Sequence, residues 1–152
     1  FAEVVWDIAA GATLDLGGQT FALDTLRGAG TLANGVLSGG NTVLSPGGDG
    51  ALGVMTLTGI AFDGAVTYRA DVGPGGTSDR IVVSGALDVS DMRVTVNNPS
   101  DLQPQAAYLL LQADGGLDGL PDDSALPDKW RVLRQGNTLV LLRPSGTLMQ
   151  LR

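Results

Sequence analysis

The residues of this chain whose types suit acid–base or metal chemistry are almost all aspartates and arginines. Histidine and cysteine are both absent, which excludes a Ser-His-Asp or Cys-His nucleophile and any imidazole or thiolate metal site. Other bases remain open. The aspartates that merit weighing occupy turn-like positions after or before short apolar runs, and two arginines accompany them: Asp63, Asp71, Asp79, Asp88, Arg69 and Arg80.

These side chains allow a polysaccharide-cleaving site or simple turn capping. A glycosidase needs two carboxylates about 5 or 6.5 to 9.5 Å apart across a cleft, and sugars usually stack on exposed aromatic rings. The aromatic fraction here is only 5%, and Asp in turns commonly accepts hydrogen bonds from backbone amides. We therefore predict turn capping and no catalytic residues. Scattered positions for Asp63, Asp71, Asp79, Arg69 and Arg80 would end the enzyme alternative.

A Gly-rich segment offers a second chemistry. Asp114, Asp118, Asp122 and Asp123 lie within ten residues of one another, and carboxylate oxygens suit calcium. The segment lacks the EF-hand spacing and the Gly-Gly-x-Gly-x-Asp solenoid motif. We expect a solvated acidic loop, with no metal or cofactor, and leave calcium binding open. The Gly-rich stretch 73–77 is followed by no Lys, so we interpret it as a turn between strands and not as a phosphate loop.

The composition is typical of a β protein. The chain has 152 residues, of which 43% are apolar and 16% charged, with 23 Gly and 7 Pro. Glu3 and Lys129 are the only Glu and Lys, although these two residue types usually fill exposed helix faces. Gly and Asp favour turns instead. We predict an all-β chain with many turns and short strands.

The charge limits the partners. A net charge of −7 and a pI near 4.2 do not suit a phosphate backbone or an anionic membrane surface. No apolar run approaches the roughly 20 residues of a spanning helix, so we predict no nucleic-acid partner and no membrane insertion by this segment. The first residues, 1–3, show no basic stretch followed by an apolar one, so we predict no signal peptide here.

An internal repeat organises the first two thirds of the chain. Its period is about 25 residues, and it places Thr31-Leu32 on Thr56-Leu57, Leu37 on Phe62, and Thr42-Val43 on Thr67-Tyr68. Short runs with alternating apolar residues fill each repeat, and Gly, Asn, Asp or Pro separates them, which is typical of strands with one buried face. The expected strands are residues 13–16, 20–23, 31–37, 42–44, 54–58, 65–68, 81–83, 87–89 and 94–96.

Equivalent apolar residues at equivalent phases predict stacked coils, because one repeat cannot bury its inner face alone. We predict a right-handed parallel β-helix, a solenoid, over residues 1–98. An irregular β-sandwich is the alternative. Residues 99–152 differ: we expect a buried strand at 108–111, a loop at 114–128, a β-hairpin formed by 130–134 and 138–142, and a flexible tail at 144–152. A solenoid end needs such a cap, because it exposes strand edges and core.

The chain also resembles a known family. The order of LSPG at 44–47, MTLT at 55–58, GAVTY at 64–68 and SDRIVVSG at 78–85 resembles the passenger-associated repeat of bacterial autotransporters. This resemblance covers residues 28–98, and residues 108–142 resemble that family's end region. It implies the last coils of a passenger β-helix, followed by an autochaperone-like cap. The family's outer-membrane translocator barrel is absent from this chain, which leaves the secretion route open.

The leading hypothesis is therefore a structural segment of a secreted or cell-surface protein of a Gram-negative bacterium, associated with its outer membrane. Its partners would be flanking β-helix coils of the same parent chain. An adhesin surface for host or polysaccharide ligands is one alternative, and an exposed aromatic or Asn/Thr ladder on a flat face would favour it. A polysaccharide-cleaving β-helix enzyme fragment is the other. We expect deletion of residues 99–152 to leave the remaining coils prone to aggregation or proteolysis.

Overall fold

The chain is mostly β-strand in the computed structural model, which describes residues 4–38, 40, 42–48 and 52–144. The only helical elements among these residues are two short 3-10 turns, η1 (Pro74–Gly76) and η2 (Pro99–Asp101). The prediction of an all-β chain is confirmed. The flexible tail expected at 144–152 lies, apart from Pro144, outside the described residues, as do residues 1–3.

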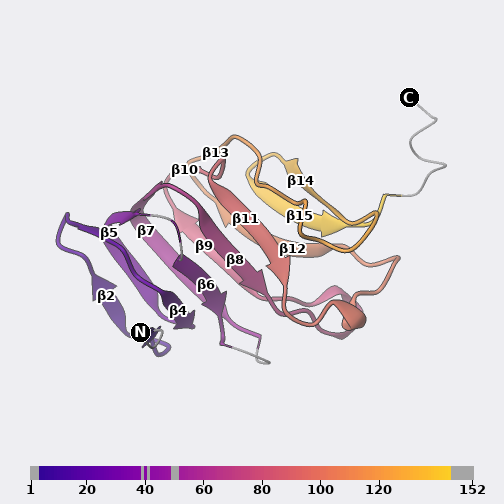
Figure 1. The fold of residues 1–152 in the computed structure, drawn as a ribbon, viewed down its shortest axis with the longest axis horizontal. Coiled ribbons are helices and arrows are strands. Elements are labelled where there is room, and N and C mark those ends of the chain that lie inside the picture. Colours follow the sequence, from indigo (N-terminus) through magenta and orange to yellow (C-terminus); the bar gives the residue numbers. More distant parts are fainter. Residues whose placement is uncertain (1–3, 39, 41, 49–51, 145–152) are drawn as a thin grey trace.

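Two sheets carry most of the strands (Figure 1). Sheet A is parallel throughout and contains, in spatial order, β1 (Val5–Asp7), β4 (Thr25–Gly28), β6 (Thr42–Pro46), β8 (Val66–Ala70) and β11 (Met92–Val96). Sheet B contains β2 (Thr13–Asp15), β5 (Thr31–Ser38), β7 (Val54–Asp63), β9 (Arg80–Ser84), β12 (Tyr108–Ala113), β15 (Thr138–Leu142) and β14 (Arg131–Gln135), and β3 (Thr20–Phe21) also pairs with β5.

The chain passes repeatedly from one sheet to the other. It runs from β4 to β5, from β6 to β7, from β8 to β9 and from β11 to β12, so each strand lies beside the strand of the previous passage. A small third pair, β10 (Leu87–Asp88) with β13 (Leu117–Asp118), is also parallel. In Figure 1 the strands follow one another along the long axis, from indigo β2 at one end to the yellow β14–β15 hairpin at the other.

The repeat predicts the register of sheet B but not that of sheet A. Leu32 lies beside Leu57 and Leu37 beside Phe62, as the repeat requires. In sheet A, however, Thr67 pairs with Val43 and not with Thr42, so the prediction there is wrong by one residue. An error of one residue is important, because a shift of one residue in the register moves every side chain of the strand to the other face of the sheet. The observed register points Tyr68 into the core beside Leu44.

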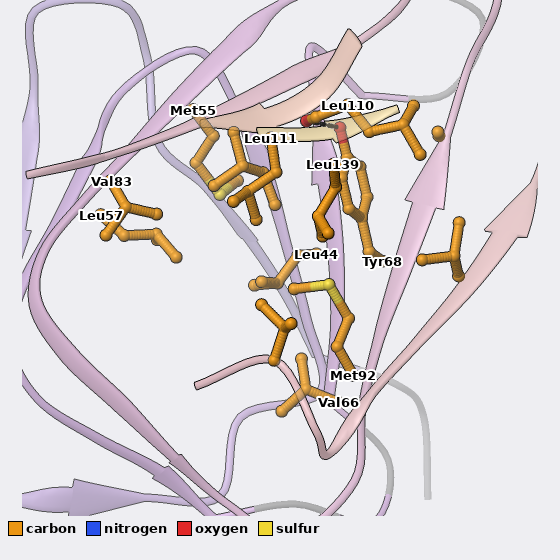
Figure 2. Packing of buried hydrophobic residues seen from close by; sticks show 14 of the residues in the cluster. Leu44, Met55, Leu57, Val66, Tyr68, Val83, Met92, Leu110, Leu111 and Leu139 are labelled. Carbon is orange, nitrogen blue, oxygen red and sulfur yellow. Dashed lines mark hydrogen bonds between the residues drawn. The ribbon is translucent and has the colours of Figure 1, made fainter. Parts of the chain in front are cut away.

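Side chains from the two sheets form one core. Rows of apolar residues continue from strand to strand, for example Leu26, Leu44, Tyr68 and Val94 in sheet A and Met55, Ile81, Leu111 and Leu139 in sheet B, all completely buried. Figure 2 shows such side chains packed together, with Leu44, Tyr68 and Met92 coming from sheet A and Met55, Leu111 and Leu139 from sheet B. The Tyr68 hydroxyl donates a hydrogen bond to the Leu110 carbonyl oxygen at 2.7 Å and so joins the sheets through the core (Figure 2).

The two longest strands are each interrupted once, at the same level. The pairing of β5 with β7 skips Asn34 and Gly59, and both have left-handed backbone, with φ values of 59° and 64°. Gly and Asn adopt this conformation most easily. A Cβ at Gly59 would lie 3.0 Å from the Asn34 Oδ1, so glycine also fits the close stacking of the two residues.

Parallel pairing continues past residue 98. Strand β12 lies parallel to β9 on one side and antiparallel to β15 on the other, and β14 and β15 form the predicted hairpin. The stretch expected to be loop at 114–128 contains the short strand β13, because Leu117 and Asp118 pair with Leu87 and Asp88. The predicted division of the chain at residue 98 stays a prediction.

Candidate functional site

Two aspartates from the candidate acid–base set come together at one corner of the stack. Asp71 directly follows β8 and Asp79 directly precedes β9, on either side of the turn that contains η1. Asp71 is 2% exposed and Asp79 is 0% exposed. We refer to this pair and its hydrogen-bond partners Gly53, Asn97 and Asn98 as the acidic corner.

Asp79 caps backbone amides from two passages of the chain. Its Oδ1 accepts a hydrogen bond from the Gly53 N–H at 3.0 Å, and its Oδ2 accepts one from the Asp71 N–H at 2.9 Å. The Asp79 N–H in turn donates to the Asp71 carbonyl oxygen at 2.9 Å. The carboxylate therefore links the segment before β7 to the segment after β8.

Asp71 extends the link to the next passage. Its Oδ1 accepts a hydrogen bond from the Asn97 Nδ2 at 2.9 Å. The neighbouring Asn98 both accepts from the Val72 N–H at 3.0 Å and donates to the Val72 carbonyl oxygen at 2.8 Å. The Asp71 Oδ2 is buried and has no hydrogen-bond partner. Three successive passages of the chain are thus joined at the acidic corner.

Burial dominates the electrostatics of this corner. It raises the pKa of Asp79 to about 7; the backbone N–H groups of Asp71 and Gly53 oppose the shift and the Asp71 carboxylate adds to it. Burial also raises the pKa of Tyr68 well above its ordinary value, with a further contribution from Asp79 and an opposing one from Arg80. Asp79 has no exposed surface, which agrees with desolvation as the leading cause.

The remaining candidate acid–base residues do not join this pair in an open cleft. Asp63 is exposed at the far end of β7, whereas the first residue of that strand, Val54, pairs with Arg80. Asp88 is also exposed; its Oδ1 accepts hydrogen bonds from the Ser90 hydroxyl and N–H, which hold its pKa below the ordinary value. The surface hollow near the corner is lined by Val72, Gly73, Pro74, Asp101 and Gln103, and not by Asp71 or Asp79.

Arg69 and Arg80 are both half-buried. The Nε atoms of both are buried and donate no hydrogen bond within the described ranges, although Arg69 has other interactions. Neither arginine forms a salt bridge with Asp71 or Asp79 among the contacts the structure gives for the described residues. Among the six candidate residues, all of which the structure describes, the two carboxylates that come together are therefore buried.

The aspartates of the Gly-rich segment have separate roles. Asp114 Oδ1 accepts from the Gly85 N–H at 2.6 Å, Asp122 Oδ1 from the Ser124 N–H at 2.9 Å, and Asp123 Oδ2 from the Val132 N–H at 3.1 Å. Asp118 is exposed on β13. Within the part of the chain that the structure describes, no three acidic side chains come together in a way that could hold a metal ion.

The stretch 73–77 forms the predicted turn between strands. The Gly73 N–H donates to the Thr77 carbonyl oxygen at 2.8 Å, and Pro74 begins η1. Gly75 has a φ of 70°, a value that glycine adopts without strain. The turn spans the gap between Asp71 and Asp79 and so brings the two carboxylates together.

A second candidate site is the closure of the C-terminal end, which we call the cap: strand β12, the loop from 119 to 130 and the β14–β15 hairpin. Trp130 is 6% exposed, and its ring centroid lies 6.1 Å from that of the completely buried Tyr108. The Tyr108 hydroxyl accepts a hydrogen bond from the Gln103 N–H at 2.8 Å. Loop residue Asp122 pairs by its backbone with Met92 and Val94, so the loop covers the outer edge of β11.

Sequence reasoning does not find the amide side chains of the acidic corner. Asn97 and Asn98 precede Pro99, where the sequence predicts only a break in the repeat pattern. The sequence feature that could have identified them is their spacing. Asn97 lies 26 residues after its partner Asp71, and Asn98 lies 26 residues after its partner Val72, which is close to the period of the repeat. An amide residue one repeat after a turn aspartate, as Asn97 is after Asp71, is therefore the pattern that could identify this corner.

No helix within the described ranges is long and apolar enough to cross a membrane. Comparisons of the chain with protein-family models, with curated proteins and with solved structures gave no match.

Proposed function

We propose that this chain is the C-terminal part of a right-handed parallel β-helix, closed by a β-hairpin cap, in a secreted or cell-surface protein of a Gram-negative bacterium. Its function is structural: it supports the folding and display of the longer passenger to which it belongs. The resemblance of residues 28–98 to autotransporter passenger repeats motivates the biological setting.

The stacking of the strands supports the solenoid part of the proposal. In sheet B, Thr31 pairs in parallel with Thr56, and Val54 pairs in parallel with Arg80, so each strand meets its equivalent in the next passage. In sheet A, Val66 pairs in parallel with Thr42 on one side and with Met92 on the other. Parallel neighbouring strands must be joined by a long crossover connection. In a solenoid the rest of each coil is that connection, so parallel pairing repeated from passage to passage is what stacked coils require.

One observation carries the cap part of the proposal: β12 pairs in parallel with β9 and antiparallel with β15. The last parallel strand of sheet B therefore presents no free edge. An unpaired edge next to an apolar core invites aggregation, and the hairpin removes that edge. Arg131 and Arg134 then place charge on β14, the new outer strand, which discourages further pairing.

The N-terminal end of the strand stack, formed by β1, β2 and β3, supports a preceding β-helix coil as partner. Trp6 lies in register with Leu26, Leu14 with Leu32, and Phe21 with Leu37. Trp6 and Phe21 are each 41% exposed, so core rows end here at side chains open to solvent. We propose that a preceding coil of the parent chain packs on this end, in parallel and with its apolar residues in the same phase.

Two truncations test the cap. A chain of residues 1–128 lacks the hairpin and exposes the edge of β12 and the core beside Tyr108; we expect it to aggregate and to be cleaved rapidly by protease. A chain of residues 8–152 lacks only β1, at the end that is already open, and is the matched control. If the 1–128 chain melted and resisted protease as the intact chain does, the cap would have no structural role.

A binding surface is the second candidate, and one observation favours it. Thr13, Thr31 and Thr56 form a row in register along sheet B, and their side chains are exposed or half-buried. Such a row is the kind of ladder expected of an adhesin face. Binding of the intact chain to immobilised polysaccharides, lost on Thr31→Val and Thr56→Val together, would support it over a purely structural role.

A further inference from the structure

The hydrogen bonds of the acidic corner do not satisfy its two carboxylates equally. Asp79 receives two backbone N–H donors, whereas Asp71 receives one side-chain N–H, and its Oδ2 is buried without a partner. A buried carboxylate is stable as an anion only when hydrogen bonds or a cation compensate for lost water. Two adjacent buried carboxylates therefore favour a state in which one of them carries a proton.

Charged and titratable groups surround the corner on β8, on β9 and on the segment after β11. Tyr68 of β8 interacts electrostatically with Asp79 and with Arg80, the first residue of β9, and Arg69, also on β8, lies two residues before Asp71. The segment before β7 contributes the Gly53 N–H. The segment after β11 contributes the amides of Asn97 and Asn98, and the Asp101 Oδ2 accepts a hydrogen bond from the Asn98 Nδ2 at 2.8 Å. Tyr68 stays protonated because burial raises its pKa, and Asp79 is the group of this corner whose charge we expect to change near neutral pH.

We propose that Asp79, with Asp71 beside it, forms a proton-dependent clasp: with a proton on Asp79 the clasp holds three successive passages of the chain together, and when that proton leaves, the clasp weakens. The position of the clasp determines which part of the chain a change of pH affects. It joins the segments before β7, between β8 and β9, and after β11, and the last of these leads into β12, the first strand of the cap. A change of pH would therefore alter how firmly the middle strands are held to the start of the cap.

The direction of the pH effect follows from the proton count. The pKa of Asp79 is about 7 in the folded chain and near 3.8 when the chain is unfolded. Between these values the folded state binds the extra proton, so the stability is fully present below about pH 4 and falls as the pH rises to 7, changing little from this source above that. The folding equilibrium constant should fall by at most roughly tenfold per pH unit within the window.

The first test needs no substitution. Carboxyl carbon signals of the aspartates, followed by NMR on the isotope-labelled intact chain from pH 3 to 9, report protonation directly. We expect the carboxyl signal of Asp79 to titrate with a midpoint near 7. If every aspartate signal titrated below pH 5, the clasp would be excluded.

The second test assigns the effect. Denaturant unfolding is measured from pH 5 to 8 for the intact chain, for Asp79→Asn and for the control Asp63→Asn, which removes an exposed carboxylate. We expect the pH dependence of the intact chain and of Asp63→Asn to be alike, and that of Asp79→Asn to be much flatter. Parallel curves for all three chains would overturn the proposal. Should Asp79→Asn fail to fold, the NMR titration decides alone.

Discussion

The two ends of the strand stack are built from similar apolar residues and differ in what lies over them. At the open end, Trp6 and Phe21 continue core rows and are each 41% exposed. At the capped end, Trp130 is 6% exposed and packs on Tyr108 beneath the hairpin. The difference teaches that burial at an end of a strand stack depends on an added element and not on the apolar residue itself.

The polar contacts at the two ends follow the same division. The open end has an exposed ion pair between Arg27 Nε and Asp7 Oδ2 at 3.3 Å, with side chains 41% and 61% exposed, and such pairs contribute little to stability. Near the capped end, the Tyr68 hydroxyl and the acidic corner make buried hydrogen bonds between different passages of the chain. The local stability of the strands should therefore increase from the open end to the capped end.

The largest expected effect comes from exchanging the two tryptophans in turn for alanine. Trp130→Ala removes a buried ring from the cap and should lower the free energy of unfolding by about 3–5 kcal/mol. Trp6→Ala removes a half-exposed ring at the open end, and should cost less than about 2 kcal/mol, because less area returns to water. Urea denaturation of both variants gives the comparison. Equal losses would show that the two ends do not differ.

A smaller effect is expected from the tyrosine hydroxyl that crosses the core. Tyr68→Phe leaves the Leu110 carbonyl oxygen without its donor in a buried place, which should cost about 1–3 kcal/mol. Tyr108→Phe is the matched variant: it removes an acceptor from the N–H of Gln103, an exposed residue, and water can replace it, so about 1 kcal/mol or less should be lost. Thermal unfolding of the two variants measures both losses. A loss for Tyr68→Phe no larger than that for Tyr108→Phe would show that the hydroxyl of Tyr68 contributes little to stability.

The sequence predicts the parts of this fold that depend on local pattern. Alternation around Thr31-Leu32 and Thr56-Leu57 defines strands and their register, because the inner face must be apolar at each repeat. The hairpin is predicted because Gly136-Asn137 separates two apolar runs. Strand β4 is not among the predicted strands, since Arg27 and Gly28 interrupt its short apolar stretch.

The sequence predicts less about sheet A and the acidic corner. The stretch of chain from Leu26 to its partner Leu44 is shorter than the stretch from Leu44 to its partner Tyr68, because the connecting segments differ in length, so a single period fails there. Turn capping by Asp79 follows from its sequence position, but its burial does not. The local sequence around an aspartate does not show whether its side chain is solvated or buried. Burial depends on residues distant in the sequence, such as Asn97, which lies 26 residues from its hydrogen-bond partner Asp71.

Amide hydrogen exchange, residue by residue on the intact chain, tests the contrast between the two ends most directly. A closed end and an open end predict that the amides of β12 and β15 exchange as slowly as those of β7 and β9, and that β1, β2 and β3 exchange faster by at least about tenfold. Exchange in the β14–β15 hairpin as fast as in β1–β3 would contradict a capped end.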